Sequence, residues 1–332
     1  MSFAAPQALR ALVARALENS GASSANAASV AAALVAAEID GQKGHGLARV
    51  AGYAAQARSG KVDGRAAPRV TQPKPAALIV DAAQGFAFPA IDLAIERLTA
   101  LAPQTGIACA AIHHSHHFGV AGRHAEHLAE RGLLALIVGN SPKAIAPWGG
   151  KRAVFGTNPI AFAAPRAKAP PLVIDLSLSK VARGRIMAAA QKGEKIPQGW
   201  ALDKDGNPTT DARAALDGVM LPLGDAKGAA LALMVEILAA ALTASHLGFE
   251  ASSFFTAEGL PPRVGQFMLA IDPGALSGGA FAERLETLLA AMLAEPGVRL
   301  PGEKRLAGRA RAATGEIEVD DKTLADIENL AR

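Results

Sequence analysis

Apolar residues in the first sixty positions recur every three or four residues, which is the spacing of an amphipathic α-helix. A second helical stretch begins near Ser24 and ends at Gly41, and a third follows Gly46 and ends before Gly60. The first stripe consists of Leu9, Leu12, Val13, Ala16 and Leu17. Positions with this spacing lie on one face of a helix. The pattern predicts three consecutive helices, with Ser24 as the N-cap of the second.

Near residue 73 the pattern changes to short continuous apolar runs that alternate with helical stretches. The runs are at 77–82, 107–112, 133–139, 171–177 and 266–272. Short apolar runs bounded by turn residues are typical of buried strands, and strands that alternate with helices indicate an α/β fold. Helical spacing returns from about residue 280. We expect a helical domain made of 1–72 plus 280–332 and an α/β domain made of 73–279.

Composition narrows the classes of function. Half of the 332 residues are apolar and 19% are charged, with a net charge of +4, which excludes general disorder and predicts no nucleic-acid surface. The apolar run Gly228–Ala244 has Glu236 near its middle, so we expect a buried helix and no membrane span. The N-terminal residues do not resemble a secretory signal. A single cysteine, Cys109, fits a reducing, cytoplasmic compartment.

Four of the eight histidines lie in the segment His113–Gly119. Zinc sites usually need cysteines or a spaced histidine pair on one helical face, whereas His113 and His117 straddle the end of a predicted strand. We therefore expect no metal site. Imidazole transfers protons near neutral pH, and loops after strands often carry function, so His117 is the candidate acid–base residue. The other three histidines are expected to hydrogen-bond the backbone.

Two further motifs suit anions. His45 and Arg49 are four residues apart at a helix start, where an arginine can hold a carboxylate through two hydrogen bonds; the alternative is an exposed arginine paired with Asp40. Lys227 lies in the motif GDAKGAA (224–230), which offers backbone N–H groups to a phosphate. The alternative there is an ordinary helix start with Asp225 as N-cap. Neither a G-x-G-x-x-G motif nor a P-loop is present.

Taken together, these segments resemble the malate/L-lactate dehydrogenase type 2 family. The matching stretches lie in the family's order between Asp40 and Arg305: DGQKGHGLARV, SHHFGVAGRHAE, GNSPKAIAPWGG, FGTNPIAFAAP, VIDLSLSKVARG, IPQGWALDKDGNPTTD, GDAKGAALALMVEIL and LPGEKR. The resemblance implies an NAD(P)-dependent oxidoreductase with a fold that is not a Rossmann fold. It also implies a homodimer in which the α/β domain holds cofactor and catalytic residues.

The resemblance also implies the chemistry and the site residues. The expected reaction interconverts a 2-hydroxy acid and a 2-oxo acid, nearest to the (2R)-3-sulfolactate branch, with malate or lactate next. His117 would be the catalytic acid–base, taking the hydroxyl proton, while His45 and Arg49 bind the substrate; His45 and Asp203 are further catalytic candidates. The cofactor contacts would be Ser141, Asp175, Leu176, Ser177 and Lys227. From the residues alone, Lys180 and Arg183 could meet the 2′-phosphate of NADP, and Lys43, Arg123 or Lys143 could supply a second cation for a dianionic substrate.

One position departs from the family. Gly44 precedes His45 where the family usually has serine, which in the cyclic imine reductases is held to assist proton transfer. Its absence favours a hydroxy-acid reaction over NADPH-dependent reduction of Δ1-piperideine- or Δ1-pyrroline-2-carboxylate. A zinc-dependent hydrolase and a non-catalytic ligand-binding protein are the alternatives from other classes.

Overall fold

A seven-stranded mixed sheet forms the centre of the protein, in the order β2-β3-β4-β11-β5-β6-β7. The computed structural model describes residues 1–313 and 315–332. Within that part of the chain, β3 and β4 are the one parallel pair in this sheet, and every other neighbouring pair is antiparallel. The strands are β2 (Arg69–Lys74), β3 (Ala77–Asp81), β4 (Ile107–Ser115), β5 (Leu134–Gly139), β6 (Ile160–Ala164), β7 (Leu172–Leu176) and β11 (Val264–Ile271).

Strand β2 was not predicted from the sequence. The proline-rich segment reads as a linker, yet it forms the edge of the sheet and pairs with β3. Pro73 has no N–H to donate, and prolines in sheets are found on edge strands for that reason. Most of β2 is exposed, so it also lacks the continuous apolar run that identifies the buried strands.

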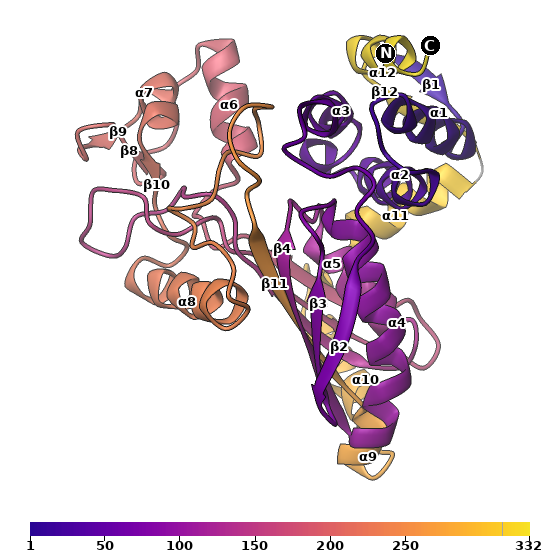
Figure 1. Ribbon diagram of the computed structural model, residues 1–332. Coiled ribbons are helices and arrows are strands. Elements are labelled where there is room, and N and C mark those ends of the chain that lie inside the picture. Colours follow the sequence, from indigo (N-terminus) through magenta and orange to yellow (C-terminus); the bar gives the residue numbers. More distant parts are fainter. Residues whose placement is uncertain (314) are drawn as a thin grey trace.

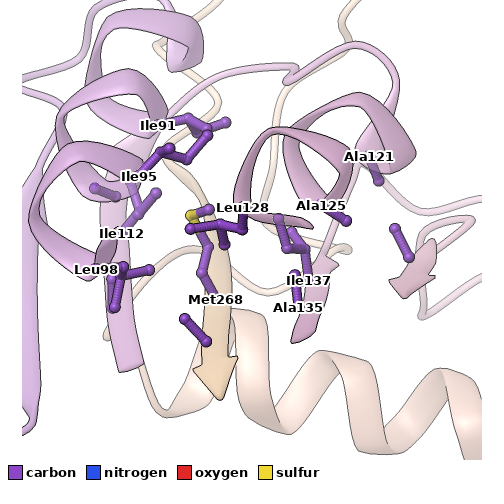
Figure 2. Packing of buried hydrophobic residues seen from close by; sticks show 14 of the residues in the cluster. Ile91, Ile95, Leu98, Ile112, Ala121, Ala125, Leu128, Ala135, Ile137 and Met268 are labelled. Carbon is purple, nitrogen blue, oxygen red and sulfur yellow. The ribbon is translucent and has the colours of Figure 1, made fainter. Parts of the chain in front are cut away.

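Helices α4 (Ala87–Thr105) and α5 (Ala121–Ala129) cover one face of the sheet. Figure 2 shows Ile91, Ile95 and Leu98 of α4 packed near Ile112 of β4 and Met268 of β11. Along β4 the small residues Ala108 and Ala110 alternate with less buried ones, so the side chains beneath the helices belong to one face. This core fixes the strand ends that carry the site.

The N-terminal helices form a second core with the end of the chain (Figure 1). It contains α1 (Pro6–Glu18), α2 (Ser24–Ile39), α3 (Val50–Ser59) and α12 (Asp321–Leu330), and β1 (Ser2–Ala4) pairs with β12 (Ile317–Val319). The three predicted helices are confirmed, but the N-cap of α2 is Ser23, whose hydroxyl accepts a hydrogen bond from the N–H of Asn26. Helix α11 (Glu303–Ala313) packs on α2, whereas α9 (Pro273–Ser277) and α10 (Phe281–Leu293) lie beside the sheet.

A third, smaller core lies across from the N-terminal helices in Figure 1. It contains α6 (Arg183–Lys192), α7 (Ala212–Asp217), β8 (Ala201–Leu202), β9 (Pro208–Thr209) and β10 (Val219–Met220). The sequence patterns did not separate it from the rest of the α/β part.

Helix α8 (Ala226–Glu236) continues through a π-helical turn, η3 (Ile237–Ala241), and was expected to be buried. Only one face is covered: Ala232 and Val235 are buried, whereas Leu233 and Ile237 are about half exposed. A helix that is apolar on all sides gives no periodic signal of which face is open. Among the described residues, no helix combines the length and apolarity needed to cross a membrane.

Candidate active site

The carboxyl ends of four strands meet at one edge of the sheet. Strand β3 is parallel to β4, β11 is antiparallel to both β4 and β5, and β6 is antiparallel to both β5 and β7. Strands β3, β4, β5 and β7 therefore run in the same direction. The edge where they end carries Asp81, the histidines 113–117, Ser141 and residues 175–177, so most candidate residues converge there as α/β proteins place ligand-contacting groups.

His45 and His117 form a hydrogen-bonded pair beside this edge. His45 ends the short helical turn η1 (Lys43–His45), and Arg49 ends the next turn, η2 (Leu47–Arg49), so the two lie in consecutive turns before α3. His45 Nδ1 is 3.2 Å from His117 Nε2, and the two rings are nearly parallel, at 7°. The structure thus brings together the predicted substrate-binding and acid–base histidines.

Tyr53 completes a chain of three side chains. Its hydroxyl is 2.5 Å from His117 Nδ1, so both nitrogens of His117 have partners and the ring is buried. Burial raises the pKa of Tyr53 far above its usual value, which keeps the hydroxyl protonated. Within the described part of the chain, His45 Nε2 has no hydrogen-bond partner, and His45 is only partly buried. The outer end of the chain is therefore His45 Nε2.

Both imidazoles are neutral at pH 7. Burial, helped by the charge of Arg49, lowers the pKa of His45 to about 4 and lowers that of His117 well below its usual value. His116 is buried against Tyr53 and Phe254, with no hydrogen bond to either ring nitrogen. The expectation that the other three histidines hydrogen-bond the backbone was wrong. The His116 ring makes packing contacts alone, and the His114 ring is hydrogen-bonded to the Asp81 carboxylate.

Arg49 keeps most of its hydrogen-bonding capacity. Its Nε donates to the carbonyl of Gly44 at 2.7 Å, and its guanidinium lies 4.7 Å from the centre of the Phe255 ring. No other hydrogen bond involves this guanidinium among the described residues. The alternative pairing with Asp40 does not occur, since that carboxylate accepts two hydrogen bonds from Arg309. Two terminal nitrogens thus remain for a carboxylate.

Two buried side chains hold the loop at 252–258 beside the histidines through hydrogen bonds to its backbone carbonyls. The Nζ of Lys61 donates to the carbonyls of Ser253, Thr256 and Glu258, and Gln56 Nε2 donates to those of Phe254 and Thr256. The Phe254 ring lies 5.2 Å from that of His117.

Sequence reasoning missed this clamp and Tyr53. The four-residue spacing of His45, Arg49 and Tyr53 was a signal for the tyrosine, but the sequence patterns place Tyr53 only within the third predicted helix and give it no role in the site. Nothing local in the sequence identifies Lys61, because its partners lie about 190 residues away.

The predicted cofactor residues fall into two neighbouring groups. Ser141 follows β5, and its hydroxyl accepts a hydrogen bond from the N–H of Thr157 at 3.0 Å. Asp175 ends β7 together with the exposed Leu176, and its carboxylate accepts one from the N–H of Gly122 at 2.7 Å, at the start of α5. In the structure, the Asp175 carboxylate thus binds a backbone N–H at the start of α5. A cofactor role for Ser141, Asp175 and Leu176 stays a prediction.

The second group lies where residues 177–180 run beside 221–225. Lys180 Nζ is 3.8 Å from Asp225, whose carboxylate makes no capping hydrogen bond at the start of α8. Gly228 is required by close packing, since a Cβ there would lie 1.6 Å from the carbonyl oxygen of Leu223. Because the Asp225 side chain does not cap α8, this helix start is a candidate anion site with Lys227 in its first turn, where the N–H of Lys227 itself donates to the carbonyl of Gly224.

Ser177 and Arg183 also have protein partners. The Ser177 hydroxyl is 2.7 Å from that of Ser179, and Arg183 donates to the carbonyl of Leu216 at 3.1 Å.

Asp203 lies in the hairpin between β8 and β9, away from the histidine pair. Its carboxylate accepts hydrogen bonds from the N–H groups of Asp205 and Asn207, which is the usual way an aspartate stabilises a turn. No contact joins Asp203 to His45 or His117 among the described residues, and its catalytic role stays a prediction.

Comparison with known proteins covers nearly the whole chain. A family model described as malate/L-lactate dehydrogenase matches residues 4–328. A (2R)-3-sulfolactate dehydrogenase (NADP(+)) of Chromohalobacter salexigens is 56% identical over 298 residues, which is 90% of this chain and 89% of that protein. A Delta(1)-pyrroline-2-carboxylate/Delta(1)-piperideine-2-carboxylate reductase of Pseudomonas putida is 42% identical, covering 97% of this chain and 95% of that protein.

Solved structures of the same fold are similarly complete matches. The delta1-piperideine-2-carboxylate reductase from Pseudomonas syringae has a TM-score of 0.94 at 39% identity, over 99% of this chain and all of that one (100%). The sulfolactate dehydrogenase from Methanocaldococcus jannaschii has a TM-score of 0.91 at 28% identity, over 99% and 96%. The fold is therefore the mixed α/β fold of these enzymes.

Proposed function

Since this chain belongs to the malate/L-lactate dehydrogenase family of oxidoreductases, as its resemblance implied, we propose that it interconverts (2R)-3-sulfolactate and sulfopyruvate with NADP. The observation that carries this proposal is the neutral His45–His117 pair beside an arginine with two unused nitrogens. Such a site can hold a 2-hydroxy acid by its carboxylate and remove its hydroxyl proton. The 56% identity to an NADP-dependent sulfolactate dehydrogenase supports the choice of substrate and cofactor.

The proton transfer follows from the order Tyr53, His117, His45. When Nδ1 of each histidine carries its proton, His117 donates to the Tyr53 oxygen and His45 donates to His117, which leaves a lone pair on His45 Nε2. We assign that nitrogen as the base that meets the substrate hydroxyl. His117 then acts behind it, accepting a hydrogen bond that stabilises the charged form of His45. This divides between two imidazoles the role that the sequence assigned to His117 alone.

Substrate binding prepares the reverse reaction. The positive charge of Arg49 helps to lower the pKa of His45 in the free protein. A carboxylate bound to Arg49 offsets that charge, so the pKa of His45 rises and a protonated imidazole can form beside the 2-oxo group. The ammonium of Lys61 is a second positive charge, which acts on His116, the residue before His117, and it supports a dianionic substrate. Arg123 is not available for this purpose because it pairs with Glu126.

The residues at the start of α8 fit an NADP phosphate. The uncapped N–H groups, Lys227 and Lys180 supply hydrogen-bond donors and positive charge, and a helix start favours anions. Bound NADP would accept a hydride from C2 of the hydroxy acid. We further propose that this binding is not of the Rossmann type, because the sheet is largely antiparallel and no glycine fingerprint follows a strand. NAD is the alternative cofactor.

We propose the helical domain and the α/β domain that the sequence suggested, except that α10 belongs with the sheet beside which it lies, and we propose a homodimer. The separate core formed by α1, α2, α3 and α12 supports a helical domain. The exposed apolar side chains of α8 and η3, among them Leu233 and Ile237, support a partner surface. A cytoplasmic location stays a prediction.

A substrate and cofactor panel tests the function. Purified protein would be mixed with NADPH or NADH and with sulfopyruvate, oxaloacetate, pyruvate or Δ1-piperideine-2-carboxylate, and kcat/KM would be measured from the loss of reduced-nicotinamide absorbance. We expect the highest value with sulfopyruvate and NADPH. A higher value with the cyclic imine would replace the proposed substrate, and no turnover of any 2-oxo acid would refute the proposal.

A further inference from the structure

A second cluster of metal-binding side chains lies at the same sheet edge, separate from the His45–His117 pair. It consists of Asp81 at the end of β3 and His113 and His114 near the end of β4. The two strands are parallel neighbours, and Asp81 is directly opposite His113 in their register (Figure 1). One ligand atom from each residue lies within 4.8 Å of the ligand atoms of the other two.

The backbone places two consecutive histidines on the same side. Neighbouring residues of a strand normally point to opposite faces. His114 instead has a φ of +50°, in the left-handed region, and its ring centre is 4.3 Å from that of His113. The N–H groups of Ala82 and Gln84 donate to the carbonyls of His113 and His114, which holds the strand end in this conformation. A strained conformation of this kind persists only when its surroundings fix it.

The chemistry of the three side chains suits a divalent transition metal. Two imidazoles and one carboxylate form a common ligand set of zinc, whereas magnesium and calcium prefer oxygen ligands alone. The Asp81 carboxylate already faces His114, with Oδ1 3.0 Å from Nδ1, and it is positioned by the N–H of Ala83 at 2.8 Å. The His113 side chain makes no hydrogen bond to the described residues. All three side chains are partly exposed, so water can reach the remaining coordination positions.

We propose that Asp81, His113 and His114 bind one Zn²⁺ ion. The expectation of no metal site was based on the absence of cysteines and on the spacing of His113 and His117, whereas Asp81 becomes their neighbour only through strand pairing. Because His113 and His114 lie in the segment that leads to His116 and His117, the ion would fix the end of β4 beside the catalytic pair. A ligand that binds only the folded state also stabilises it.

Zinc binding by the tag-free protein tests the proposal. Titration calorimetry with zinc chloride should give one site per chain, and Co²⁺ should give visible d–d absorption bands. His113→Asn and Asp81→Asn should each weaken zinc binding by about tenfold or more, since a ligand is lost. Neither side chain is buried, and circular dichroism of the metal-free variants would verify their fold.

Two matched controls separate this site from other histidines. His127→Asn removes a histidine from α5, and His45→Asn removes one from the catalytic pair; both should bind zinc as the unchanged protein does. Unchanged binding in His113→Asn and Asp81→Asn would overturn the proposal. Loss of binding in His45→Asn, or a wild-type protein that takes up no stoichiometric zinc, would overturn it as well.

Discussion

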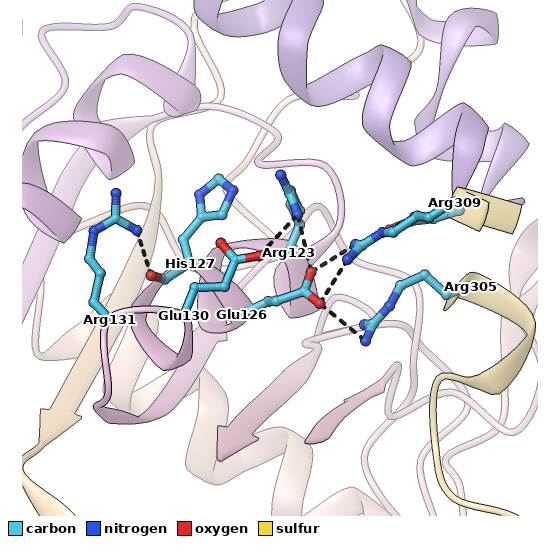
Figure 3. A network of polar contacts seen from close by, with 8 residues as sticks. Arg123, Glu126, His127, Glu130, Arg131, Arg305 and Arg309 are labelled. Atoms are coloured by element: carbon cyan, nitrogen blue, oxygen red, sulfur yellow. Dashed lines mark hydrogen bonds and ion pairs between the residues drawn. The ribbon is translucent and has the colours of Figure 1, made fainter. Parts of the chain in front are cut away.

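Replacing Arg309 by methionine should destabilise the protein strongly, because this one side chain bridges two buried carboxylates and is the one charged partner of Asp40 among the described residues. Its guanidinium donates two hydrogen bonds to Asp40 at the end of α2 and two to Glu126 of α5, all between 2.7 and 2.8 Å. The Asp40 and Glu126 side chains are only 2% and 1% exposed. Figure 3 shows Arg309 and Arg305 of α11 reaching Glu126. The network thus joins the helical core to the sheet.

The expected loss is about 3–5 kcal/mol, the usual cost of leaving a buried charge without its partner. For a chain of 332 residues the unfolding entropy is roughly 0.7 kcal/mol per kelvin, so Tm should fall by about 4–7 °C. Differential scanning calorimetry measures the fall. Arg131→Met is the matched control, since Arg131 is exposed and bonds only the carbonyl of His127; it should change stability by less than about 0.5 kcal/mol.

The stabilisation that Arg309 gives through Glu126 should depend on pH in a defined direction. Burial alone would raise the pKa of Glu126, but hydrogen bonds from Arg309 and the charges of Arg305 and Arg123 hold it below its usual value. The stabilisation is therefore complete above the pKa of the unfolded glutamate and is lost as pH falls through the lower folded value. The Tm difference between the protein and Arg309→Met should shrink on acidification. A difference below about 1 °C at pH 7 would refute the reasoning.

Three substitutions address the active site. Tyr53→Phe removes the hydrogen-bond partner of His117 Nδ1. Since an unpaired buried group costs about 1–3 kcal/mol, kcat should fall by about 5- to 150-fold while the affinity for NADPH stays unchanged. An unchanged kcat would show that the tyrosine contributes packing alone. Gly44→Ser places a hydroxyl beside His45, at a position where a Cβ meets no atom within 4 Å. The folded variant should therefore gain activity on Δ1-piperideine-2-carboxylate relative to sulfopyruvate. An unchanged ratio of the two kcat/KM values in the substrate panel would contradict this. Lys61→Met releases three carbonyls of the 252–258 loop and should make that loop more sensitive to limited proteolysis and raise KM, whereas unchanged cleavage would contradict the clamp.

The sequence predicted the elements that have a clear apolar period. The three N-terminal helices and the strands β3, β4, β5, β7 and β11 lie where the patterns placed them, because each buries one face or both faces in a core. Strand β2 was missed since it is an exposed edge, and the open face of α8 was missed since the helix is apolar on every side. The sheet's strand order depends on pairings between distant segments, which no local pattern contains.

The site shows the same division. His45, Arg49 and His117 were identified by motif and resemblance, and the structure brings the two histidines into contact. The residues that set the protonation of the two histidines and cover the site reach them only through tertiary contacts. Tyr53 was hidden as a core residue, and Lys61 reaches a loop about 190 residues further along the chain. Asp81 becomes a neighbour of the histidines only through strand pairing.

Isotope labelling of the transferred hydride tests whether the protein reduces sulfopyruvate by direct hydride transfer from NADPH. NADPH that carries deuterium at the transferred position of nicotinamide C4 would be incubated with sulfopyruvate and the protein, and the product examined by proton NMR. We expect sulfolactate with deuterium at C2, formed at a rate that His45→Asn lowers by about 10²–10⁴-fold while NADPH still binds. Unlabelled sulfolactate, no sulfolactate at all, or an undiminished rate in the variant would contradict it.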